Sequence, residues 1–273
     1  GVAKLAETYA LEIEMGEAER KTLICAALLH DVGHGPLSHT LEPVFEEYFG
    51  TNHHRTTRDI VKGTTRFGSH ILDILSEFEV DTEEVLALID GEDVGRYSFL
   101  FSSPINIDTL EGITRCRAFA GPRSAFGSAS AAVRRWATSG RLPTNDFDDF
   151  WDLKNNVYNL VINAPIGRLL DTVAQSYMVA NIDRFGKNDF LKTEKGFRAS
   201  HPELFAYLSV VLEHEDDLRS HLPKSWLDAD VNINDRKFFV DDSIELVGLH
   251  HINARYKQTR SRQSVKLNEL VKG

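Results

Sequence analysis

Apolar residues recur at helical spacing along most of this chain, and no other sequence feature constrains the fold as strongly. Helices are predicted at Val2–Met15, Glu17–Leu29, Leu41–Phe49, Thr56–Lys62, Ser69–Phe78, Asp81–Asp90, Ile107–Phe119, Phe150–Ile162, Gly167–Asn181 and Pro202–Leu218. The second of these is apolar nearly all round towards its end, which is typical of a central, buried helix. Only Arg236–Val240 is typical of a strand. The sequence therefore predicts a mainly α fold with a minor β element near the C-terminus.

The size and charge of the chain narrow the class of protein. Its 273 residues are enough for one large domain or two small ones. The net charge of −10 argues against broad electrostatic binding to nucleic acid or to an anionic membrane, although a local basic site remains compatible with it. No run of about 18 apolar residues predicts a membrane helix, and no signal peptide is visible. The two cysteines, Cys25 and Cys116, form no disulfide framework, so a reducing, cytoplasmic location is expected.

Metal-type ligands are concentrated in Leu28–Glu42, which reads LLHDVGHGPLSHTLE. His30 and Asp31 end an apolar helix, immediately before Gly33. Neighbouring residues on a helix point about 100° apart, so these two side chains can converge on one ion only at a helix end. A neutral imidazole and a carboxylate together suit a divalent transition metal. The alternative is a capping or hydrogen-bonded pair without a metal.

More potential ligands surround this pair. His34 and His39 follow it, and Glu42 lies three residues after His39 on the same helical face. A second histidine cluster follows in NHHRTTRDIV, residues 52–61. Asp108 lies in an apolar context, in SSPINIDTLEGITR, where a helix N-cap is an equally good interpretation.

The segment ALLHDVGHGPLSHTLE resembles the core motif of HD-superfamily phosphohydrolases. It is most similar to the deoxynucleoside triphosphate triphosphohydrolase branch, which includes dGTPases and the SAM-and-HD-domain dNTPase. That branch reads His-Asp-φ-Gly-His-Gly-Pro-φ-Ser-His, where φ is apolar, and every position is matched here. HHRTTRDIV resembles the branch's His-Glu-x-x-Ser/Thr segment, and NIDTLEGITR resembles its Asp-φ-Asp-x-φ-Asp-Tyr segment. The likeness is strong over residues 1–119 and faint beyond them.

The resemblance implies a set of site residues. His30, Asp31 and Asp108 would be metal ligands, and the family's first ligand histidine is expected just upstream of Gly1. His34 and His53 would contact phosphate oxygens or protonate the leaving oxygen, and Glu42 would orient one of these two histidines. His54 is an alternative to His53, and His39 is expected to be mainly structural.

The resemblance also implies an organisation and a reaction. It implies an HD-domain helical bundle with the metal-bearing core in residues 1–120, a loop-containing insertion in residues 121–145, and a helical extension with a small β element and a basic tail in residues 146–273. The cofactor would be a divalent ion such as Mn, Fe, Zn, Ni or Mg. The substrate would be a nucleotide, with a dNTP cleaved to deoxynucleoside and triphosphate. A homo-oligomer is expected from the family.

Departures from the family pattern leave other functions open. Gly112 and Cys116 occupy the positions that usually contact the sugar, and Pro165 occupies the position of an expected Lys or Arg. Arg115 and Arg168 are possible substitutes for the phosphate contact. A phosphodiesterase acting on another nucleotide, or a non-catalytic module that senses a nucleotide, is therefore also considered.

The C-terminal segment ARYKQTRSRQSVK, residues 254–266, is basic. It would suit a triphosphate, nucleic acid or an acidic partner. The alternative is a solvated, partly disordered tail.

Overall fold

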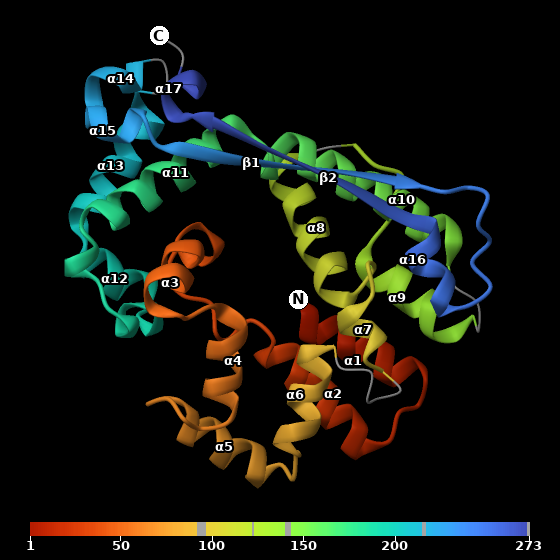
Figure 1. Ribbon diagram of the computed structural model, residues 1–273. Coiled ribbons are helices and arrows are strands. Elements are labelled where there is room, and N and C mark those ends of the chain that lie inside the picture. Colours follow the sequence, from red (N-terminus) through yellow and green to blue (C-terminus); the bar gives the residue numbers. More distant parts are fainter. Residues whose placement is uncertain (92–96, 122, 140–142, 215–216, 272–273) are drawn as a thin grey trace. The chain divides into compact units, whose positions relative to one another are not determined.

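The computed structural model of the chain describes residues 1–91, 97–121, 123–139, 143–214 and 217–271 (Figure 1). Helices dominate, and a two-stranded sheet is the β structure of this described part, so the prediction of a mainly α fold with a minor β element is confirmed. The chain divides into two compact units, which are described separately. None of the described helices combines the length and the apolar character needed to cross a membrane.

The first unit comprises Gly1–Val32, Thr57–Val161 and Arg236–Thr259. Its helices are α1 (Val2–Glu12), α2 (Glu17–Leu29), α5 (Gly68–Glu77), α6 (Thr82–Asp90), α7 (Phe99–Ser102), α8 (Ile107–Ala120), α9 (Ala129–Thr138), α10 (Thr144–Val157) and α16 (Ile252–Arg255). Helix α4 (His53–Val61) enters this unit from the second one. Helix α1 packs on α2, α8 and α9, and fully buried Ala6 and Ala10 let these backbones approach closely (Figure 1). Helix α10 adds Phe147, Phe150 and Trp151 to the same core.

The second unit comprises Gly33–Thr56, Ile162–Asp235 and Arg260–Gly273. Its helices are α3 (Glu42–Phe49), α11 (Pro165–Ala180), α12 (Glu194–Ser200), α13 (Pro202–Glu213), α14 (Leu218–His221), α15 (Lys224–Leu227) and α17 (Leu267–Leu270). The core gathers around α11 and α13 and includes Phe45 of α3. A Cβ at Gly35 would lie 2.8 Å from the ring of Phe190, so the Gly-His-Gly-Pro turn needs glycine at this position.

Strand β1 (Asp230–Val240) pairs with β2 (Tyr256–Lys266). The predicted strand Arg236–Val240 is the second half of β1. The alternative of a disordered tail for the basic segment is wrong, because most of that segment is β2. Residues 257–264 of β2 are all exposed, so the apolar alternation that marks a half-buried strand is missing there. Pairing with β1 therefore defines this strand.

Two further predictions need correction. Helix α2 is not buried all round: it buries Thr22, Leu23, Ala26 and Ala27 on one face, whereas Leu28 is 64% exposed. The helix predicted from Phe150 begins at Thr144 and continues beyond Val157 as a π-helical turn, Tyr158–Ile162.

The expected insertion at residues 121–145 contains helix α9. The Ser128 side chain caps this helix by accepting a hydrogen bond from the backbone N–H of Ala131, at 3.2 Å. Residues 122 and 140–142 of the segment lie outside the described residues. The division into core, insertion and extension stays a prediction.

Candidate functional site

Three potential metal ligands converge in the first unit. Helix α2 ends at Leu29, and His30 is its C-cap, so the side chains of His30 and Asp31 leave the helix end together. The Nε2 atom of His30 lies 3.3 Å from Oδ2 of Asp31 and 3.4 Å from Oδ1 of Asp108, near the start of α8. One ligand atom from each residue lies within 4.8 Å of the others. We call His30, Asp31 and Asp108 the three-residue centre.

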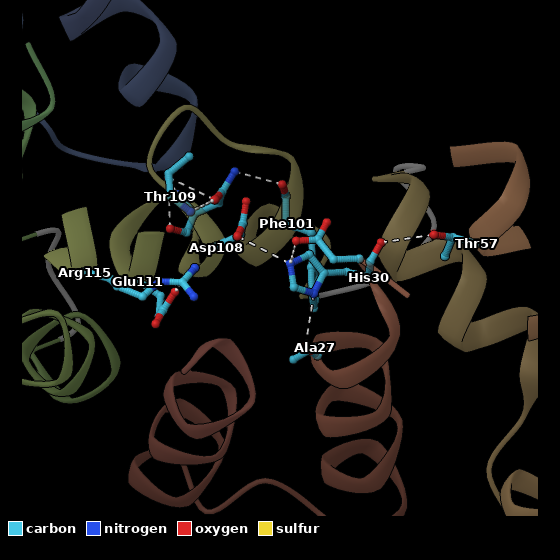
Figure 2. Close-up of polar contacts among 10 residues, drawn as sticks. Ala27, His30, Thr57, Phe101, Asp108, Thr109, Glu111 and Arg115 are labelled. Carbon is cyan, nitrogen blue, oxygen red and sulfur yellow. Dashed lines mark hydrogen bonds and ion pairs between the residues drawn. The ribbon is translucent and has the colours of Figure 1, made fainter. Parts of the chain in front are cut away.

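One backbone contact orients the His30 ring, and a second contact holds the His30 backbone (Figure 2). Its Nδ1 lies 3.1 Å from the carbonyl oxygen of Ala27, and because a carbonyl only accepts, Nδ1–H must donate. The Thr57 hydroxyl donates to the His30 carbonyl at 3.4 Å, which ties the helix end to α4. Metal-binding histidines commonly donate their second ring N–H in this way. The Nε2 edge of the ring is therefore left to face the two carboxylates, and Nε2 would become a metal ligand once it gives up its proton.

The electrostatics of the three-residue centre favour a cation. Burial lowers the pKa of His30, but the hydrogen bonds that His30 donates to Asp108 and Asp31 outweigh it and raise the pKa to about 10. The same two carboxylates that favour a proton at this position also favour a divalent ion. The side chains of Asp31 and Asp108 are about half exposed, at 55% and 47%, which leaves room for water or a phosphate oxygen. Imidazole and carboxylate together fit a divalent transition metal.

The N-cap of helix α8 positions Asp108, and the N-cap residue is Asn106. The Asn106 side chain accepts from the N–H of Thr109 at 2.7 Å, and the Thr109 hydroxyl accepts from the N–H of Asn106 at 3.2 Å. Asn106 also donates to the carbonyls of Phe101 and Ser103, both at 3.0 Å. The N-cap interpretation of Asp108 is therefore wrong, and its carboxylate is free to face His30.

Replacing Asn106 with alanine is expected to lower the free energy of unfolding by roughly 1–2 kcal/mol, because the cap is lost. It should also weaken metal binding, because Asp108 lies two residues further along the same first turn. Urea unfolding and metal titration measure the two effects. Asp81→Ala is the matched control, since Asp81 caps α6 by accepting from Glu83 N–H at 2.7 Å. An equal loss of metal affinity in both variants would contradict this role for Asn106.

A second group of potential ligands lies in the second unit. It consists of His34, His39, Glu42 and His53, with one ligand atom of each within 4.8 Å of the others. We call it the histidine cluster. The rings of His34 and His53 stack at 4.3 Å with 9° between their planes. His39 is edge-on to both and 72% exposed.

Glu42 holds His53 through two hydrogen bonds. Its Oε2 accepts from Nδ1 of His53 at 2.5 Å and from the backbone N–H of His53 at 3.1 Å. Burial raises the pKa of Glu42, but the bonds from His53 outweigh it, so the carboxyl pKa is lowered and Glu42 is ionised at neutral pH. Burial lowers the pKa of His53, and Glu42 opposes this shift only in part. Of the two histidines considered for orientation by Glu42, the structure pairs it with His53.

The other predicted site residues lie outside the three-residue centre and the histidine cluster. His54 is exposed and its ring lies 4.0 Å from that of His53, outside the histidine cluster. Arg115 is exposed and pairs with Glu111 of the same helix at 3.1 Å (Figure 2). Arg168 of α11 pairs with Asp235 at 2.5 Å, so binding a phosphate would compete with this pair. Their roles in binding substrate stay predictions.

Sequence reasoning missed Lys154. This residue of α10 is only 7% exposed, and its Nζ lies 4.5 Å from the Trp151 ring and 3.5 Å from the Pro104 carbonyl. Burial and the charge of Arg236 lower the pKa of Lys154 to about 8, while Asp108 acts in the opposite direction. The ammonium group also lies 5.0 Å from the Phe238 ring, so Lys154 is enclosed by aromatic side chains. The sequence does contain a sign that Lys154 is buried, because this lysine lies among the apolar residues of α10.

Residues 1–91 of the chain match the family model of the HD domain. The match includes His30, Asp31 and the histidine cluster, whereas Asp108 lies beyond it. HD domains are typical of metal-dependent phosphohydrolases and bind divalent metals.

One relative is an uncharacterized protein named YwfO from Bacillus subtilis (strain 168), which is 34% identical over 102 residues. The matched stretch covers 37% of this chain and 22% of the length of that relative.

Proposed function

We propose that this protein is a divalent-metal-dependent phosphohydrolase that acts on a nucleotide, with a dNTP as the first candidate. The observation that carries the proposal is the three-residue centre, in which Nε2 of His30 faces two carboxylates at 3.3 and 3.4 Å within a chain that contains an HD domain. A bound divalent ion would lower the pKa of water and neutralise charge on the phosphoryl group.

The protein residues would have separate roles in this reaction. His30, Asp31 and Asp108 would hold the ion and orient it. His53, held by Glu42, and its stacked neighbour His34 would contact phosphate oxygens and pass a proton to the leaving oxygen.

With a dNTP, water would add to the α-phosphorus, and the bond from that phosphorus to the sugar oxygen would break. The water proton would pass to the sugar oxygen, leaving deoxynucleoside and triphosphate. A cytoplasmic location, a homo-oligomeric state and contact of the basic strand with nucleic acid stay predictions.

A second candidate is hydrolysis of a phosphodiester in another nucleotide. It is favoured by Gly112, which occupies the position of a sugar-contacting tyrosine in the resembling family. A Cβ placed on Gly112 would meet nothing within 4 Å, so this face of α8 is open. A differently shaped sugar or a linked nucleotide would fit such a position better than a site built to hold one deoxyribose. A non-catalytic nucleotide sensor would keep the metal and show no turnover.

The test combines metal analysis with a substrate panel on one preparation. Metal content per chain is measured, and phosphate products are then followed with four dNTPs, cyclic nucleotides and linear dinucleotides. Triphosphate release that is lost on chelation and restored by adding back metal supports the dNTP reaction. Turnover of diesters alone supports the second candidate. Metal with nucleotide binding but no turnover supports the sensor, and absence of metal contradicts all three. Two metals per chain would indicate that the histidine cluster also binds one.

A further inference from the structure

A cavity of about 520 Å³ lies within the first unit, separate from the three-residue centre. It is formed where α1 ends and α2 begins, together with residues of α7, α9 and the segment before α16. Helix α2 has 13 residues, and His30 follows its other end, so the two places are roughly 20 Å apart along the helix. A volume in this range suits a small organic molecule.

Aromatic rings form the inner wall of the cavity. Tyr9 and Trp136 are buried, at 9% and 6% exposure, and their ring centres are 6.1 Å apart. Tyr97 and Phe99 also line the cavity, with ring centres 6.3 and 6.1 Å from that of Tyr9. All three neighbours stand edge-on to Tyr9 at 73°. Aromatic side chains that line a space can attract a cation through their electron-rich ring faces.

The charged residues at the rim are acidic. Glu14 and Glu19 line the cavity and are exposed, and no basic side chain lines it among the described residues. Neither carboxylate has an ion-pair partner within 4.0 Å in the described part of the chain. Glu14 adopts a left-handed backbone conformation, φ 52°, at the turn between α1 and α2, which holds its side chain at this corner.

The N-terminus of α2 weighs against a cation, because a helix start carries about half a positive charge. Two carboxylates exceed that charge, and Glu19 lies in the first turn of the same helix. Glu17 also belongs to that turn, but it pairs with Lys21 at 3.0 Å. Among the described residues the balance of charge at the rim is therefore negative, which disfavours phosphate-bearing ligands and favours cations.

We propose that this cavity binds an organic cation, an alkylammonium group attached to a small apolar body. The ammonium group would lie against the aromatic wall between Glu14 and Glu19. The apolar body would fill the remaining volume beside Met15 and Leu249, which line the same cavity. This site is independent of the phosphohydrolase proposal, and its test needs no turnover.

The test compares choline with 3,3-dimethylbutan-1-ol, which has the same shape with carbon in place of the charged nitrogen. Binding is followed by calorimetry and by tryptophan fluorescence, because Trp136 lines the cavity. Choline is expected to bind and to alter the emission, with the neutral alcohol at least roughly tenfold weaker. Equal binding of the two compounds would overturn the proposal, as would absence of choline binding to protein that is folded by circular dichroism.

Variants locate the site. The double variant Glu14→Gln with Glu19→Gln is expected to weaken choline binding at least roughly tenfold, since both carboxylates are removed from a partly desolvated cation. Glu17→Gln is the matched control, because Glu17 lies between them in sequence, is exposed and does not line the cavity. Unchanged affinity in the double variant, or an equal loss in the control, would overturn the assignment.

Discussion

Replacement of His30 with alanine is expected to reduce divalent-metal affinity by at least roughly 100-fold, and phosphoester hydrolysis with it. His30 is the one member of the three-residue centre whose ligand atom, Nε2, faces both carboxylates. Loss of a residue that merely supports a metal ligand commonly costs 10–100-fold, so loss of the ligand itself should cost at least as much. Metal content after dialysis and titration with a chelator measure the effect.

Asp108→Asn should also reduce metal affinity. The substitution removes the negative charge of the Asp108 side chain, which faces His30, and keeps the shape of that side chain. His70→Ala is the matched control, since His70 is an exposed histidine on α5 of the same unit. Circular dichroism shows whether each variant is folded. Full metal content in folded His30→Ala and Asp108→Asn proteins would contradict the three-residue centre as the metal site.

Replacement of Glu42 with glutamine is expected to lower kcat by roughly 100- to 10,000-fold with metal content unchanged, if His53 transfers a proton in the reaction. The amide keeps the shape of Glu42 but loses the charge that accepts Nδ1–H of His53 at 2.5 Å. Because the Glu42 carboxylate raises the pKa of His53, its removal must lower that pKa further. The limb of the pH–rate profile that reports His53 should therefore move to lower pH.

Glu46→Gln is the control for this experiment. Glu46 lies one helical turn further along α3, is exposed, and accepts from the Asn52 side chain at 2.8 Å. It should leave both kcat and the pH profile unchanged. A Glu42→Gln protein with lower kcat but an unmoved pH profile would show that Glu42 acts through structure and not through the protonation of His53.

Much of the helical structure was predictable because it depends on local patterns. Glu17–Leu29 begins and ends as expected, since acidic residues open the helix and the break at Gly33 follows it. Helix α6 (Thr82–Asp90) forms within the predicted range Asp81–Asp90, with Asp81 as its N-cap. Strand β2 was not predictable, because its exposed polar residues 257–264 become a strand through hydrogen bonds to β1. The exposure of Leu28 was also missed, because the sequence does not show which residues pack against an apolar side chain.

The sequence by itself determined the mainly helical fold and the presence of His30, Asp31, His34 and His53 in a motif like that of HD phosphohydrolases. These features depend on residue type and short spacing, which are local. Only the tertiary structure decided that Asp108 faces His30 from 78 residues away, that Glu42 holds His53, and that Lys154 is buried. Each of these depends on how separate helices pack together, and the aromatic cavity lined by Tyr9 and Trp136 has the same origin. Spacing along the sequence does not encode which helix faces meet, because that is settled by the joint burial of many apolar side chains.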